Sequence, residues 1–296
     1  MDADFHPSGG VNIGIDLGQR HLRQRDACRR LGSRRLGSQR PGSLRPGMRR
    51  LGSLLLMDHS ADTNAAIWQS EEVAAAYAAE VATSERNDAA QQRFMAVLLP
   101  FAEQEAFTFL DLGAGTGAAS RAILARYPRS SAILADFSVQ MMGAGEREMQ
   151  PFAGRYRYVE FDMSGGEWPA AIPAGLDAVV TSMCVHHLPD ERKQSLFAEI
   201  FGRLVPGGWY LNYDPVAAED PVVEATWERV NDHYDPEAAG RRQKRTPAEQ
   251  ARWDNHLRYV VPLSRQLQYL RSAGFRGIDV YWKQLENVIY GGCRPG

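Results

Sequence analysis

The chain has 296 residues, of which 44% are hydrophobic and 24% are charged, and its formal net charge is −2 at pH 7. This composition is ordinary for a globular protein with a full hydrophobic core, and no apolar run is long enough to span a membrane. The charge is uneven, because residues 1–56 hold eleven arginines and four aspartates and the remainder therefore has a net charge of −9. Phosphate contacts need a basic surface, so nucleic acid is not expected as the main partner.

The cysteines bear on compartment and on metal binding. Cys28, Cys184 and Cys293 are odd in number and far apart. Their spacing provides neither a disulfide framework nor a metal-ligand motif, so we expect no metal site and a reducing, cytoplasmic location. The sequence contains no signal for a particular oligomeric state.

Residues 1–56 do not have the pattern of a folded segment. Between Arg30 and Ser53 a five-residue repeat places glycine in every unit and proline in two of them, which prevents a helix. A basic arm and an organelle transit peptide are alternatives. The chain has only three lysines against 31 arginines, which is typical of a GC-rich coding sequence, where open frames extend upstream of true starts. We therefore expect a disordered extension over 1–56, with translation starting near Met57, and one domain over 57–296.

From Asp58 onward, segments of helical and strand pattern alternate, which predicts an α/β fold with a doubly wound, mostly parallel sheet. The last two strands are expected to form an antiparallel hairpin, and a turn is expected at 206–208. The predicted helices cover residues 67–81, 87–99, 118–127, 138–148, 190–204 and 263–273. The predicted strands cover residues 107–112, 132–135, 157–161, 176–181, 209–213, 278–282 and 287–290.

Residues 217–262 interrupt this alternation with a polar, helical insertion. Its position after a strand predicts a lid over the carboxyl edge of the sheet. Trp227, Tyr234 and Trp253 would then be apolar walls facing a substrate, or they would pack the lid onto the core.

The most informative stretch is Leu110–Gly117, in which an apolar strand ends at Asp111 and three glycines follow before a helix. Strand, glycine turn and helix in this order form a nucleotide-type pocket at the carboxyl edge of a parallel sheet. A carboxylate before the first glycine would repel a pyrophosphate but suits a ligand with a cationic amine. The pattern therefore favours S-adenosylmethionine over NAD, although Gly113-x-Gly115-x-x-Ala118 would also pass as a dinucleotide fingerprint.

Two further acids stand at the ends of the next two predicted strands. Asp136 ends the second strand, where a carboxylate can accept the ribose hydroxyls, and Asp162 ends the third, where it can accept the adenine amino group. Because the carboxyl ends of parallel strands meet at one edge, we expect Asp111, Asp136 and Asp162 to share a crevice.

Taken together, these motifs resemble those of class I S-adenosylmethionine-dependent methyltransferases that act on small molecules. Residues 109–117 match the first motif of that family, and 136–142, 162–163 and 177–188 resemble the second, third and fourth. Residues 204–208 resemble the turn before the fifth strand. The resemblance implies a Rossmann-like seven-stranded sheet and S-adenosyl-L-methionine as cofactor. The residues that it assigns to the cofactor are Asp111, Gly113, Ala114, Gly115, Asp136, Phe137, Asp162, Met163 and Ser182.

The expected reaction is methyl transfer to an O, N or C atom of a small organic acceptor, and a carboxylate is one candidate acceptor. The sulfonium methyl is already activated, so the enzyme chiefly aligns the reactants and excludes water. Where the nucleophile must lose a proton, His186 is the candidate general base, ahead of its neighbour His187. Two alternatives stay open at this point: an NAD-dependent oxidoreductase, and a non-catalytic protein that binds S-adenosylmethionine.

Overall fold

The computed structural model describes residues 88–237, 240, 244 and 257–296. Its strands are β1 (Thr108–Leu112), β2 (Ser131–Asp136), β3 (Tyr156–Glu160), β4 (Leu176–Ser182), β5 (Leu204–Pro215), β6 (Arg276–Gln284) and β7 (Asn287–Cys293). Its α-helices are α4 (Asp88–Leu98), α5 (Ala118–Arg126), α6 (Val139–Met149), α7 (Asp190–Arg203), α8 (Pro221–Tyr234) and α11 (Leu263–Ala273). Two short 3₁₀ turns are η1 (Gln150–Phe152) and η2 (Val185–His187).

All these strands belong to one seven-stranded sheet with the order β3-β2-β1-β4-β5-β7-β6. Strands β1 to β5 pair in parallel, whereas β7 is antiparallel to both β5 and β6. The predicted mixed sheet with an antiparallel C-terminal hairpin is therefore confirmed. The strand order reverses between β1 and β4, and in open α/β sheets ligands bind outside the carboxyl ends of the strands at such a point.

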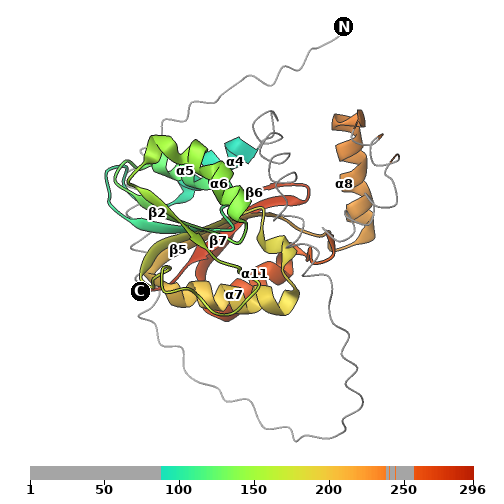
Figure 1. Ribbon diagram of the computed structural model, residues 1–296. Helices are drawn as coiled ribbons and strands as arrows, with labels where there is room; N and C mark the ends of the chain where they lie inside the picture. Colours follow the sequence, from blue (N-terminus) through green and yellow to red (C-terminus); the bar gives the residue numbers. More distant parts are fainter. Residues whose placement is uncertain (1–87, 238–239, 241–243, 245–256) are drawn as a thin grey trace, which may run out of the picture.

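Helices cover both faces of the sheet, as Figure 1 shows. On one face, α4, α5 and α6 enclose a core to which α5 contributes Ile123 and Leu124. On the other face, α7 and α11 pack over a second core that includes Leu196 and Leu270. The strands β1, β2, β4 and β5 between them are buried on both sides, which explains their continuous apolar runs.

Local signals set several element ends. The Ser138 hydroxyl accepts a hydrogen bond from the Met141 amide at 3.2 Å and caps α6. Gly274 ends α11 with φ of 104°, a left-handed conformation that suits glycine. The helix ends predicted from the sequence thus lie within one or two residues of the observed ones.

The start of β5 departs from the prediction. Residues 206–208, expected as a turn, lie within β5, and the pairing with β4 shifts register between Leu176 and Ala178. Gly207 takes φ of 84°, and the Gly208 carbonyl accepts a hydrogen bond from the Arg294 amide at 2.8 Å. The segment is therefore an irregular start of the strand, held by the end of the chain, rather than a separate turn.

The edge strand β6 is also irregular. Its pairing with β7 shifts register between Arg276 and Asp279 and again between Val280 and Trp282. At its end, Leu285 occupies the connection to β7 with φ of 51°, which is uncommon for a residue other than glycine.

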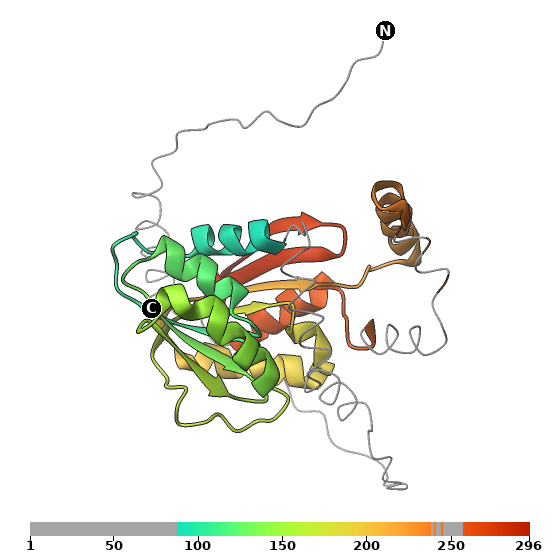
Figure 2. The same ribbon diagram turned by 45° about the horizontal axis from the view of Figure 1, so that its top comes forward.

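Part of the predicted insertion is described. Helix α8 has no buried residue and stands away from the sheet in both views (Figures 1 and 2). Its contacts with the β6–β7 hairpin include the Lys283 ammonium, 4.3 Å from the centre of the Trp227 ring. Tyr234 is 81% exposed and so forms no wall of a pocket here. The lid role itself stays a prediction.

Other expectations fall on residues that the structure does not describe. These are the extension 1–56, the helix over 67–81, and Trp253. The boundary near Met57 therefore stays a proposal.

Among the described residues, no helix is both long and apolar enough to cross a membrane. Cys184 is a free thiol, and Cys293 is buried beside the Arg276 carbonyl. Cys28 lies outside the described residues.

Candidate functional site

The glycine loop after β1 has the backbone geometry that only glycine adopts easily. Gly113, Gly115 and Gly117 have φ values of 72°, 53° and 80°. The amides of Gly113 and Ala114 donate to the Ala135 carbonyl at 2.8 and 3.1 Å. These bonds bend the loop across the end of β2 toward the N-terminus of α5.

Gly113 lies where the segments that follow β1, β3 and β4 meet. A Cβ atom at this position would lie 2.6 Å from Cys184 Sγ and 2.7 Å from Met163 Cε. The Cys184 thiol also donates to the Leu112 carbonyl at 3.2 Å. The loop after β1 is therefore in contact with the segments that follow β3 and β4, as the expected shared crevice requires.

Asp111 is buried at the base of this loop, with 1% of its surface exposed. Its Oδ2 atom accepts hydrogen bonds from the Ser120 amide at 3.1 Å and from the Ser120 hydroxyl at 2.7 Å. Its Oδ1 atom is buried and has no hydrogen-bond partner among the described residues. Burial raises the pKa of Asp111 from 3.8 to about 6. A buried acceptor without a partner is a site where a cationic donor would be stabilised.

Asp136 ties the loop to β2. Its Oδ2 atom accepts from the Gly115 amide at 2.7 Å, and its Oδ1 atom accepts from the Ser138 amide at 2.8 Å. Burial raises the pKa of this carboxyl group as well. Each carboxylate oxygen can accept a second hydrogen bond, so these contacts leave capacity for a diol.

The other predicted cofactor residues are at the same edge of the sheet in different environments. Phe137 follows Asp136 directly and is half-buried. Asp162 is exposed, and its carboxylate accepts from the Ser164 amide at 2.8 Å. Met163 is buried against Gly113. Ser182 ends β4 and is half-buried, directly before Met183. Met183 has φ of 55°, a strained conformation that is common at functional sites.

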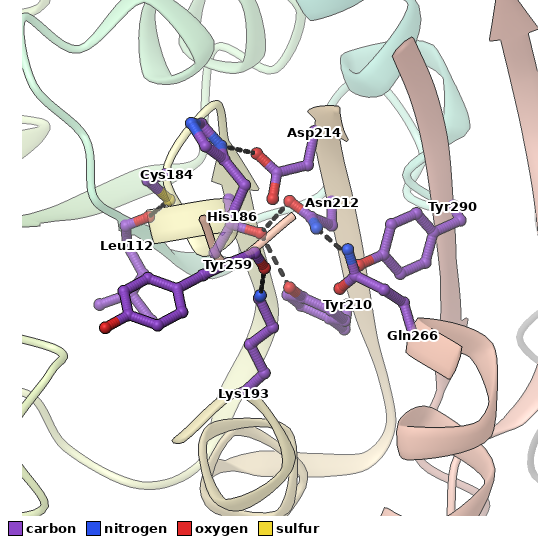
Figure 3. Close-up of polar contacts among 11 residues, drawn as sticks. Leu112, Cys184, His186, Lys193, Tyr210, Asn212, Asp214, Tyr259, Gln266 and Tyr290 are labelled. Carbon is purple, nitrogen blue, oxygen red and sulfur yellow. Dashed lines mark hydrogen bonds and ion pairs between the residues drawn. The ribbon is translucent and has the colours of Figure 1, made fainter. Parts of the chain in front are cut away.

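His186 is buried in η2, just beyond the end of β4, and is paired with Asp214 at the end of β5. The His186 Nδ1 and Asp214 Oδ1 atoms are 2.7 Å apart, and the two residues are 1% and 0% exposed. Figure 3 shows the imidazole pointing toward the carboxylate. A carboxylate can only accept, so Nδ1 carries the proton and, in the neutral ring, Nε2 is the basic atom. This is how a general base is oriented.

A network of buried hydrogen bonds lies behind this pair (Figure 3). The Thr181 hydroxyl bonds to the Tyr210 hydroxyl at 2.8 Å and donates to Asn212 at 2.7 Å. Asn212 in turn donates to the Tyr290 hydroxyl at 2.7 Å, and that hydroxyl donates to Gln266 at 2.6 Å. The network links β4, β5, β7 and α11, and so fixes the edge on which Asp214 stands.

Lys193 is fully buried in α7 beside the same network. Its ammonium donates to the Tyr259 carbonyl, on the segment that returns from the insertion (Figure 3). Burial lowers the pKa of Lys193 from 10.5 to about 8, and the nearby charge of Asp214 opposes that shift.

Asp214 and Lys193 are residues that the sequence reasoning missed. Asp214 directly follows the apolar strand predicted over 209–213. The rule that selected Asp136 and Asp162, an acid at the end of a strand, would have selected it too. No local signal marks Lys193, because its burial depends on tertiary packing.

Comparison with known families identifies the part of the chain that contains the glycine loop. The family model described as a methyltransferase domain matches residues 109–208, from β1 to the start of β5. Residues 109–208 therefore match a methyltransferase domain. The glycine loop and the parallel strands β1 to β4 belong to the matched part, and the predicted family resemblance is confirmed.

Solved structures with the same fold include several methyltransferases. An O-methyltransferase family protein from Burkholderia thailandensis is 18% identical, with a TM-score of 0.56, and the match covers 79% of this chain and 63% of that one. Human N-acetylserotonin methyltransferase in complex with SAM is 17% identical, with a TM-score of 0.53 and coverages of 79% and 59%. An O-methyltransferase family 2 protein from Planctomyces limnophilus in complex with apigenin is 18% identical, with a TM-score of 0.54 and coverages of 76% and 61%.

These similarities show that the described chain shares the fold of these methyltransferases. The match spans only about three fifths of each solved chain, between 59% and 63%. A search of curated proteins gave no match.

Proposed function

We propose that this methyltransferase domain binds S-adenosyl-L-methionine and transfers its methyl group to a small organic acceptor. The observation that carries the proposal is the buried Asp111 carboxylate beneath the glycine loop, with an oxygen that has no hydrogen-bond partner among the described residues. A cationic amine would satisfy that oxygen, whereas a pyrophosphate there would meet a like charge.

The other residues at this edge fit the same cofactor. Gly113, Ala114 and Gly115 would hold its methionine end together with Asp111, and Asp136 would accept the ribose hydroxyls. Asp162 and Met163 would hold the adenine, with Phe137 adjacent and Ser182 near the sulfonium. The cradle formed by Gly113 supports this assignment, because a Cβ atom there would collide with Cys184 and Met163. When bound, the cofactor supplies an activated methyl group, so this chain need only position the acceptor and manage its proton.

The buried His186–Asp214 pair makes a hydroxyl the preferred acceptor group in this proposal. Asp214 holds His186 in the tautomer whose Nε2 can take a proton. A carboxylate acceptor is already ionised at neutral pH and needs no base, so the pair would have no proton to remove from it. We therefore rank hydroxyl acceptors above the carboxylate considered from the sequence.

Binding of the purified chain to S-adenosylmethionine, S-adenosylhomocysteine and NAD, measured by isothermal titration, tests the cofactor. We expect binding of the first two and none of NAD, and binding of NAD alone would overturn the proposal. A panel of small phenols, alcohols, amines and carboxylic acids with labelled cofactor then tests transfer. Tight cofactor binding without transfer to any acceptor would favour a non-catalytic binding protein.

Location and partners stay predictions. A cytoplasmic location rests on the cysteine count, and the exclusion of nucleic acid rests on the acidic charge of residues 57–296.

A further inference from the structure

The peptide groups of Gly115, in the middle of the glycine loop, are held from two sides. Its N–H donates to Asp136 at 2.7 Å, and its carbonyl accepts from the Tyr158 hydroxyl at 3.3 Å. Tyr158 lies on β3, two strands away from β1 in the sheet. The ring is half-buried and packs against the core that α4, α5 and α6 cover. Its hydroxyl therefore reaches the loop from the side of that core.

The path of the Tyr158 side chain depends on a glycine in α6. A Cβ atom on Gly145 would lie 2.0 Å from the Tyr158 hydroxyl and 2.9 Å from Thr116 Cα. Real Cβ atoms do not approach other atoms that closely, so alanine at this position would displace the hydroxyl or the loop. A Cβ atom on Gly117 would also lie within 3.2 Å of the same hydroxyl. The hydroxyl thus occupies a space bordered by Gly115, Gly117 and Gly145.

From this geometry we propose that Tyr158 is a positioning residue for the cofactor loop and that Gly145 is glycine in order to admit its hydroxyl. The inference rests on the proposed function, because the loop matters only if it binds the cofactor. Asp136 and Tyr158 act as a pair: one fixes the Gly115 amide and the other fixes its carbonyl, so the loop enters binding already ordered. Pre-ordering reduces the entropy lost on binding and so strengthens affinity.

The chain offers a matched control on the same two elements. Tyr156, also on β3, donates its hydroxyl to Glu146 of α6 at 2.7 Å, in an exposed position away from the loop. Tyr158→Phe and Tyr156→Phe therefore each remove one hydroxyl bond of β3, and only the first touches the loop. Gly143 is the control for Gly145, because a Cβ atom there would meet nothing within 4 Å.

The experiment measures the Kd for S-adenosylhomocysteine, the melting temperature and the hydrogen exchange of the loop amides in the full-length chain. We expect Tyr158→Phe to weaken binding roughly 2- to 10-fold, the worth of one hydrogen bond, and to speed exchange at Gly115 and Gly117. Tyr156→Phe and Gly143→Ala should change neither the Kd for S-adenosylhomocysteine nor the exchange of the loop amides. Gly145→Ala should weaken binding further, and adding Tyr158→Phe should restore part of the loss, because the colliding hydroxyl is gone.

The outcomes separate this inference from the proposed function. Failure of the wild-type chain to bind S-adenosylhomocysteine would overturn the proposed function and this inference with it. If the wild type binds, an unchanged Kd and unchanged loop exchange in Tyr158→Phe would overturn the inference alone. Equal effects of the two tyrosine variants would overturn it too, since they would reflect general weakening of β3. The exchange measurement and the Tyr158→Phe variant remain decisive even if Gly145→Ala does not fold.

Discussion

Asp214 on β5 and His186 in η2 form a buried pair, with 2.7 Å between Oδ1 and Nδ1. The second carboxylate oxygen of Asp214 is also buried and has no hydrogen-bond partner among the described residues. A carboxylate this deeply buried is costly unless it is paired, and the His186 imidazole provides that partner for Oδ1.

The first prediction tests this pair in catalysis. His186→Gln should lower kcat for a hydroxyl acceptor by roughly 10²- to 10⁴-fold, the usual contribution of a general base, with the Kd of the cofactor unchanged. Asp214→Asn should act in the same direction, because it no longer fixes the tautomer. His187→Gln, in the same turn, is the control and should cost far less. Full activity of His186→Gln on a hydroxyl acceptor would refute the role of the histidine.

The second prediction concerns Asp111 and stability. Burial raises its pKa to about 6, so between pH 3.8 and 6 the folded state binds more protons than the unfolded state. Stability from this group therefore falls as pH rises through that window, by up to about 3 kcal/mol. Asp111→Asn should remove this dependence and be at least as stable as wild type at pH 7 in urea unfolding.

The third prediction concerns the same carboxylate and cofactor affinity. Protonation of Asp111 removes the charge that would attract the cofactor's amine, so the Kd for S-adenosylmethionine should rise as pH falls below about 6. Asp111→Asn should bind weakly at every pH and show a flatter profile. Titrations at pH 5 to 8 measure this, and equal affinity of the two chains at pH 7 would count against the amine contact.

The fourth prediction concerns Lys193. Its folded pKa is lowered to about 8 from 10.5, so between these values the unfolded state binds more protons and stability from this group rises with pH. Below pH 8 the full cost of burying the charge is present. The difference in unfolding free energy between wild type and Lys193→Met should therefore change between pH 8 and 9.5, in favour of wild type at the higher pH. A constant difference across that range would argue against a buried, charged lysine.

The fifth prediction compares two glycines with left-handed backbones. Gly154 has φ of 81° and open space around it, so Gly154→Ala should cost only the conformational strain, about 1–2 kcal/mol. Gly113 has φ of 72° and in addition faces Cys184 and Met163. Gly113→Ala should therefore cost more stability and also abolish cofactor binding, which Gly154→Ala should preserve. Urea unfolding and titration of both variants measure the two effects.

Much of the fold could be predicted from the sequence because its signals are local. The buried strands are apolar runs, and Gly274 marks the end of a helix. The predicted turn at 206–208 was wrong because its residues are held by Arg294, from the far end of the chain, and no local pattern contains that contact.

In the candidate site, too, some residues are marked by local sequence signals and others depend on contacts between distant segments. Asp111 and the glycines are recognisable because the strand, the acid and the turn are contiguous in the chain. Asp136 was predicted to face a ribose, but its hydrogen bond to the Gly115 amide depends on how β1 and β2 lie side by side. The roles of Tyr158 and Lys193 depend on packing between elements far apart in sequence.

The irregular pairing of β6 has a consequence for behaviour at high concentration. This strand is one edge of the sheet, and its two register shifts interrupt the regular row of backbone groups that another chain would need for pairing. At the opposite edge, β3 is only five residues long and carries the exposed charges of Arg157 and Glu160. Both edges are thus poor templates for adding a foreign strand, which protects a sheet of this size from aggregating edge to edge.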